Sequence, residues 1–205
     1  MSLVASTGRW LALLVAGFLL PGFGSGAALA QQSAAGLERQ VKAAFLYRFI
    51  DYVRWPDSAF AKPDSPIVIG VMADPGMVAE VQAVVAGRSV RGHPITVRPI
   101  RESEAAQSPA VHVLFIGGQA NSRLQRIIRA MDGPVLVVTE AEDGLSQGAV
   151  INFVIAERRV RFEVALMHAS ARSLAIASGL LSVAINVRKD SRAPIEVPVM
   201  ATLTP

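Results

Sequence analysis

VKAAFLYRFIDYVRWP, residues 41–56, holds five of the chain's twelve aromatic residues and ends at a proline. Apolar residues in this stretch follow the three- and four-residue spacing of one helical face: Phe45, Phe49, Tyr52 and Val53. Because Pro56 disfavours helical geometry at the residue before it, the pattern predicts a helix that ends at Trp55. We therefore expect a core helix that buries an aromatic face.

The sequence before this helix has the pattern of a secretory signal peptide. Within residues 1–30, the single charge Arg9 precedes an apolar run, and Ala28-Leu29-Ala30 fits a small-x-small cleavage site. The apolar run is about half of the roughly 20 residues that a bilayer span needs, which favours cleavage over a signal anchor. We expect export, cleavage near Ala30 and a chain that starts at Gln31.

Composition limits what the exported chain does. The 175 residues after Ala30 are enough for one domain with its own core. The absence of cysteine excludes thiol catalysis, cysteine-zinc sites, a disulfide redox switch and a lipid anchor on a cysteine after Ala30. The signal contributes one of 20 basic residues and none of 16 acidic ones, which leaves a scattered net charge of +3. This weak charge argues against nucleic-acid binding.

Strands and helices alternate through the middle of the chain. Short apolar segments predict strands at residues 67–71, 93–99, 110–116 and 135–138. Asp74-Pro75 predicts a helix N-cap followed by proline at the first helical position, and a second helix is expected at about 119–131. Such alternation predicts parallel strands joined by right-handed crossovers.

The pattern changes after residue 148. Residues 149–155 and 160–164 predict an antiparallel hairpin, residues 168–187 a last helix, and residues 188–205, with three prolines, a loose tail. We therefore expect an α/β fold: a single three-layer domain over residues 31–187, with a mainly parallel sheet, a C-terminal antiparallel hairpin and flanking helices.

Catalytic and metal-binding patterns are weak. Gly144-Leu145-Ser146-Gln147-Gly148 matches the G-x-S-x-G pattern of a hydrolase, but it leads into a strand instead of forming a strand-to-helix elbow. The histidines, His93, His112 and His168, lack the i+3 or i+4 partners of metal sites on helices. We expect no catalytic residue, metal or cofactor, although a hydrolase using Ser146 is a third hypothesis.

A ligand site is possible where a predicted strand meets a predicted helix. Gly117-Gly118 lies at this junction, and Asn121 and Ser122 add polar donors. Helix N-termini and the carboxyl edges of parallel sheets bind anions or nucleotide-like ligands. A tight turn is the default explanation of the glycines, because the loop has no lysine and no fuller glycine fingerprint.

Alternating charges mark one face of the predicted hairpin. Arg159, Arg161 and Glu163 should share this face, because side chains two residues apart in a strand point the same way. Either this is a solvated strand face or it is a docking surface, since arginine on a rigid strand is favoured in protein interfaces. Arg172, at the start of the predicted last helix, would extend the surface.

Three segments resemble the YfiR-like family of small periplasmic proteins. The first is the Val-Lys-Ala-Ala-Phe-Leu-Tyr helix ending in Trp-Pro; the second is Gly148 to Phe153 with its partner Val160 to Val164; the third is Ala171 to Leu181. The likeness covers about residues 41–184. It departs at Ser173, where the family usually has glycine, and at Ala165, where it usually has asparagine. The resemblance assigns these residues to a shared motif core: Phe45, Tyr47, Phe49, Trp55, Pro56, Asn152, Phe153 and Phe162.

The resemblance implies a periplasmic regulator without enzymatic activity. Such a protein binds the sensory domain of an inner-membrane diguanylate cyclase and represses it, which lowers cyclic di-GMP and biofilm formation. It also implies a homodimer and a releasing partner at the outer membrane. The main alternative is a periplasmic ligand-sensing or solute-binding domain that uses the Gly117-Gly118 edge.

Overall fold

The structure is a computed structural model that describes residues 25–105, 110–118 and 123–189, with side chains from residue 34 onward. Its helices are α1 (Ser25–Tyr52), the short 3-10 helix η1 (Asp57–Ala59), α2 (Pro75–Val85), α3 (Glu102–Ala105), α4 (Leu124–Ala130), α5 (Leu166–Ala171) and α6 (Ser178–Leu181). Its strands are β1 (Val53–Arg54), β2 (Ile67–Met72), β3 (Ser89–Val90), β4 (His93–Pro99), β5 (Val113–Ile116), β6 (Leu136–Thr139), β7 (Ile151–Ala156), β8 (Arg159–Ala165), β9 (Ala175–Ile176) and β10 (Asn186–Arg188).

The main sheet has the strand order β10-β8-β7-β6-β5-β2-β4-β3. The middle of the sheet is parallel and consists of β4, β2, β5, β6 and β7. Strand β8 is antiparallel to β7, and β3 is antiparallel to β4. Strand β10 adds parallel to β8, and β1 and β9 form a separate antiparallel pair. The predicted α/β class with a mainly parallel sheet and a C-terminal hairpin is confirmed.

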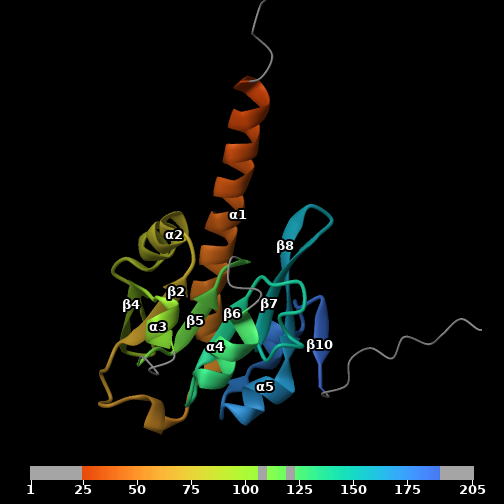
Figure 1. Cartoon of the computed structure of the whole chain (residues 1–205). Helices are drawn as coiled ribbons and strands as arrows, with labels where there is room; N and C mark the ends of the chain where they lie inside the picture. Colours follow the sequence, from red (N-terminus) through yellow and green to blue (C-terminus); the bar gives the residue numbers. More distant parts are fainter. Residues whose placement is uncertain (1–24, 106–109, 119–122, 190–205) are drawn as a thin grey trace, which may run out of the picture.

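Two hydrophobic cores lie on the two faces of the central strands. In β5, Val113 and Phe115 pack with side chains of α1 and α2, whereas Leu114 and Ile116 pack with those of α3 and α4. This division follows from the alternation of side chains along a strand. Helices α1 and α4 therefore lie on opposite sides of the central strands (Figure 1).

The aromatic face of α1 forms the centre of the first core. Phe49 is fully buried, and its ring lies 5.1 Å from that of Phe162 and 5.7 Å from that of Phe153. Phe45 is partly buried and stacks on Phe49 at 5.9 Å. Tyr52, which the spacing places on the same face, is 37% exposed, so that part of the prediction is wrong.

Helix α1 ends at Tyr52, not at Trp55 as predicted. Val53 and Arg54 are extended because they pair with β9, and Arg91 Nη2 donates hydrogen bonds to the carbonyl oxygens of Ile50 (2.6 Å) and Val53 (2.8 Å). The guanidinium of Arg91, from a turn far away in the sequence, thus satisfies carbonyl groups at the end of the helix, and the helix ends before Pro56. Helix α1 begins at Ser25, and cleavage near Ala30 stays a prediction.

The predicted last helix over residues 168–187 is wrong. The chain forms α5, β9, α6 and β10 there, because β9 pairs with β1 and β10 pairs with the edge of β8. The break after α5 occurs at Ser173, which has a left-handed φ of +55°. Arg188 is the last residue of β10, so the expected tail begins later, and residues 190–205 lie outside the described part.

The left-handed backbone at Ser173 gives a stability prediction. Glycine adopts this conformation without the Cβ clash that serine incurs, so Ser173→Gly should raise the free energy of unfolding by about 0.5–1 kcal/mol in urea denaturation. The matched variant Ser170→Gly lies in α5 and should lower it by a few tenths of a kcal/mol. Equal effects of the two variants would show that the φ of Ser173 is not the cause.

Candidate functional site

The predicted docking residues of β8 share one face of the hairpin. Phe162 and Val164 point into the first core and are nearly fully buried, so Arg159, Arg161 and Glu163 point to the other side. Within the described residues, neither arginine side chain has a hydrogen-bond or ion-pair partner, while Glu163 accepts a hydrogen bond from Asn186 Nδ2 at 3.2 Å. The turn between the strands has positive φ at both Glu157 and Arg158, as a tight two-residue hairpin requires.

Among the residues that the structure describes, no helix covers this side of the hairpin as α3 and α4 cover the central strands. No residue of β7 or β8 belongs to the core that α3 and α4 build over the central strands. The loop after β6 covers the start of β7, where a Cβ on Gly144 would lie 2.6 Å from Asn152 Oδ1, and it reaches Arg188 of β10 through Ser146. The uncovered side, which we call the open hairpin face, is formed by Val154, Arg159, Arg161, Glu163 and Asn186.

Arg172 does not extend the open hairpin face. Its guanidinium donates hydrogen bonds to the carbonyl oxygens of Ile128 (3.0 Å) and Met131 (3.3 Å) at the C-terminal end of α4. Burial lowers the pKa of this guanidinium, although Asp132 opposes the shift. Arg172 therefore satisfies carbonyl groups at the C-terminal end of α4, a role that its sequence position did not indicate.

The Gly117-Gly118 edge lies where the crossovers change direction. Helix α2 follows β2 onto one face, and α4 follows β5 onto the other, so a crevice opens between the carboxyl ends of β2 and β5. A hollow of about 420 Å³ occupies it, lined by Ala73, Asp74, Gly117, Gly118 and Glu140. Asn121 and Ser122 lie outside the described residues.

An internal carboxylate already uses the amide expected to bind an anion. Gly118 N donates to Glu140 Oε1 at 2.7 Å, and Gly117 N donates to the carbonyl oxygen of Met72 at 2.8 Å. The hollow also presents Asp74 and Glu140, which disfavours an anionic ligand. The ligand-sensing alternative stays a prediction.

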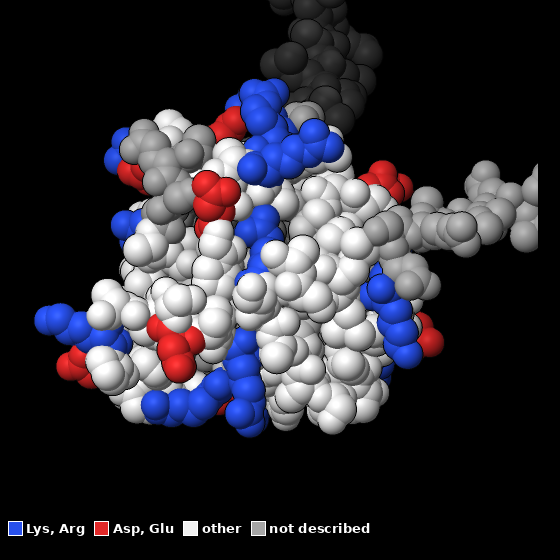
Figure 2. Space-filling view, turned by 90° about the horizontal axis from the view of Figure 1, so that it is seen from below, with Lys and Arg blue, Asp and Glu red and all other residues white. Residues whose placement is uncertain are grey.

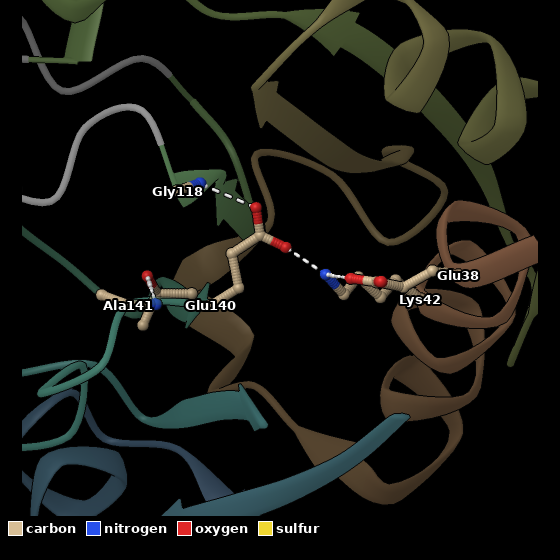
Figure 3. A network of polar contacts seen from close by, with 6 residues as sticks. Glu38, Lys42, Gly118, Glu140 and Ala141 are labelled. Carbon is tan, nitrogen blue, oxygen red and sulfur yellow. Dashed lines mark hydrogen bonds and ion pairs between the residues drawn. The ribbon is translucent and has the colours of Figure 1, made fainter. Parts of the chain in front are cut away.

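Glu140 is part of a charge network around the buried Lys42 (Figure 3). Its other carboxylate oxygen pairs with the ammonium of Lys42, which also pairs with Glu38 one helical turn earlier. Lys42 is only 7% exposed. Burial opposes its charge, but the hydrogen bonds and charges of Glu140 and Glu38 outweigh burial and raise the pKa of Lys42 above 10.5. The network joins α1 to the end of β6.

The residue patterns of the chain did not predict this network. Lys42 lies three residues before Phe45 and seven before Phe49, so the helical spacing places a lysine on the apolar stripe. That position is the one signal that could have identified it. Glu140, 98 residues away, has no comparable signal.

Ser146 and the histidines have structural contacts. Ser146 Oγ accepts a hydrogen bond from Arg188 Nη1 at 3.1 Å, in a turn that leads into a strand, so the hydrolase elbow is absent at this serine. His168 Nδ1 bonds the carbonyl of Ala149, while His93 and His112 both stack on Phe60. Among the described residues, no group of three or more His, Asp or Glu side chains could hold a metal ion.

The remaining motif residues serve packing. Phe153 is 2% exposed and Asn152 is 1% exposed. Tyr47 carries the guanidinium of Arg88 at 4.7 Å from its ring centroid. Trp55 is half-buried and its Nε1 donates to the carbonyl of His112 at 3.2 Å, while Pro56 precedes η1. Phe153, Tyr47 and Trp55 pack in or against the first core, whereas Asn152 lies on the other side of β7, against the loop at Gly144.

Charges on the underside of the domain do not form a continuous patch. Figure 2 shows lysine and arginine side chains spread among uncharged residues, with acidic residues between them. Nucleic-acid binding typically uses a clustered basic face. Among the described residues, no helix is long and apolar enough to cross a membrane.

In the described part of the chain, most motif residues serve packing, and one face of the hairpin has no helical cover. Such a domain is consistent with a regulatory role. The chain belongs to the YfiR/HmsC-like family, whose model matches residues 39–185. At the level of the family, these are periplasmic regulators of diguanylate cyclase signalling.

Two further comparisons were made. No curated protein matches the chain. A solved structure, the crystal structure of a conserved domain protein from Vibrio cholerae O1 biovar El Tor strain N16961, is similar, with 12% identity and a TM-score of 0.46. The match covers 59% of this chain and 54% of that one, so the chain spans about half the length of that protein.

Proposed function

We propose that this protein binds the periplasmic sensory domain of an inner-membrane diguanylate cyclase through the open hairpin face and represses the enzyme. The observation that carries the proposal is an antiparallel hairpin with Arg159 and Arg161 on its uncovered side and no partner for either guanidinium among the described residues. Family membership supports the class of partner.

The hairpin is suited to docking because its own packing holds it in place. Phe153 and Phe162 oppose each other across the two strands and anchor them in the first core, so little order has to be gained on binding. Arginine presents a planar group with several donors, which matches carboxylates of a partner. The open hairpin face therefore fits an acidic surface.

Repression would then be a population shift. If the regulator binds the inactive form of the cyclase more tightly than the active form, its differential affinity sets the degree of repression. Cyclic di-GMP and biofilm formation would fall with the active population. The same proposal includes export after signal cleavage, a homodimer and release by an outer-membrane partner.

Charge reversal tests the proposed surface. Arg159→Glu/Arg161→Glu should weaken binding to the cyclase's sensory domain about 100-fold, because two attractive contacts become repulsive. Binding can be measured by pull-down and titration, with far-UV circular dichroism to confirm folding. The matched control Arg98→Glu/Arg126→Glu makes the same charge change at exposed positions on β4 and α4 and should leave binding within about threefold.

The possible outcomes distinguish a wrong choice of surface from a wrong function. Failure of the folded parent to bind would defeat the regulator proposal. Binding that both double variants weaken equally would defeat only the choice of the open hairpin face.

A further inference from the structure

Strand β7 has one unpaired edge over most of its length. Strand β6 pairs with β7 only at Ile151 and Asn152, whereas β8 pairs with β7 along all six of its residues. The hairpin of β7 and β8 therefore projects past the end of β6 (Figure 1). At residues 153–156, the side of β7 that faces away from β8 has no neighbouring strand among the described residues, and we call it the free edge of β7.

The backbone groups of Ile155 point toward the free edge. Hydrogen-bonded and non-hydrogen-bonded pairs alternate along an antiparallel ladder. Ala165 N donates to the carbonyl oxygen of Val150 at 2.9 Å. The two-residue turn closes on the pair of Ala156 and Arg159, which follows the same alternation. Every second residue of β7 thus bonds to β8, and the N–H and C=O groups of Ile155 face the other way.

The free edge of β7 lacks the features that usually prevent further pairing. Native edge strands are short, carry charges or proline, or are bulged. The outer strands of the sheet follow this rule, because β3 has two residues and β10 has three and ends at Arg188. The free edge instead carries Phe153, Val154 and Ile155, and Ile155 is 58% exposed. Unpaired backbone beside an exposed apolar side chain is a template for another strand.

A hollow of about 520 Å³ lies along the free edge. Its lining combines apolar side chains of β7 with charged side chains of α1 and of the chain after β6: Phe153, Ile155, Glu38, Lys42, Glu140 and Glu142. Lys42 is already paired with Glu38 and Glu140. The exposed Glu142 side chain has no hydrogen-bond or ion-pair partner among the described residues. Three carboxylates and one ammonium give the hollow an excess of negative charge.

We infer that the free edge of β7 binds an extended basic segment of a partner protein as an added β-strand. The backbone of the segment bonds to the N–H and C=O groups of Ile155, and an apolar side chain of the segment packs on Ile155. A lysine or arginine of the segment pairs with Glu142 and Glu38. Strand addition takes its affinity from main-chain hydrogen bonds and its specificity from the side chains, and here the carboxylates select cations. The inference does not rest on cyclase binding, which is assigned to the open hairpin face.

A synthetic peptide tests the inference on the full chain. The probe is acetyl-Thr-Val-Lys-Val-Arg-Val-Thr-amide, and amide hydrogen exchange is followed by nuclear magnetic resonance. At saturation, we expect the protection of the Ile155 amide to rise about tenfold, because it gains a hydrogen bond. The Val137 amide lies in β6, which already has a strand on each side, and should keep its protection within about twofold.

Control peptides separate strand addition from a general attraction between charges. Replacing the lysine and arginine of the probe by glutamate should weaken binding about tenfold or more. N-methylation of alternate residues blocks one edge of a strand only, so one of the two alternately methylated peptides should lose binding while the other keeps it within about threefold. Equal binding of the glutamate peptide, or equal effects of the two methylation patterns, would overturn the inference.

Protein variants test the carboxylate at the edge. Glu142→Lys should weaken binding of the probe about tenfold, while Asp64→Lys, the same charge change at an exposed position in the loop before β2, should leave it within about threefold. Circular dichroism confirms that both variants fold. The inference fails if the parent does not bind the probe at about 1 mM, if binding leaves the Ile155 amide unprotected, or if both variants weaken binding equally. Protection of the Ile155 amide that rises with protein concentration alone would assign the edge to a second copy and overturn the choice of partner.

Discussion

Lys42→Met should lower the free energy of unfolding by about 2–3 kcal/mol, although methionine fits the surrounding apolar stripe. Lys42 is 7% exposed, and its ammonium pairs with Glu140 and Glu38. Its removal leaves the carboxylate of Glu140, 25% exposed at its side chain, without a counter-charge at the end of β6. Urea denaturation followed by circular dichroism measures the loss.

Two variants separate the lost pair from a general effect on α1. Arg48→Met breaks an exposed pair with Asp51 at 3.9 Å on the same helix and should cost no more than about 0.5 kcal/mol. Adding Glu140→Gln to Lys42→Met removes the stranded charge while an oxygen can still accept from Gly118, so the double variant should regain part of the stability. A double variant less stable than Lys42→Met would contradict the role assigned to Glu140.

The pH dependence of this network has a definite sign. The pKa of Lys42 is raised in the folded state, so its contribution is fully present below the ordinary value of about 10.5. It is lost as the pH rises through the raised folded pKa. The parent should therefore lose more stability at strongly alkaline pH than Lys42→Met does.

Much of the fold could be predicted because local signals agree with tertiary structure. Asp74 caps α2 through hydrogen bonds from the backbone N–H groups of Gly76 and Met77, with Pro75 at the first helical position, as predicted. The apolar segments of β2, β5 and β6 are buried, which matches their continuous hydrophobic sequence. The hairpin followed from alternation of charged and apolar residues.

The errors occur where distant residues determine local structure. Helix α1 ends early because of Arg91, and the last helix is replaced because β10 pairs with β8. The residue pattern of 168–187 does not indicate that the edge strand β8 is available for pairing. The same limit applies to the candidate sites: Arg159 and Arg161 share the expected face, but Arg172 belongs to α4, and the stack of His93 and His112 on Phe60 exists only after folding.

Phe49→Ala should lower the free energy of unfolding by about 3–5 kcal/mol, because it removes a fully buried ring from the centre of the first core. Phe49 contacts the rings of Phe45, Phe153 and Phe162, and thus joins α1 to both strands of the hairpin. The cavity cannot close easily, because these three rings are held by separate elements. Urea denaturation gives the size of the loss.

The position of Phe49 makes this variant informative about the hairpin as well as about stability. Phe49→Leu keeps most of the volume and should cost about 1–1.5 kcal/mol, which separates cavity formation from loss of the aromatic contacts. Phe49 packs on Phe153 of β7 and on Phe162 of β8. A folded Phe49→Ala variant should therefore show faster amide exchange in β7 and β8 than in β2 and β4. Uniform exchange across the sheet, or a loss below about 1.5 kcal/mol, would show that the aromatic cluster does not hold the hairpin in place.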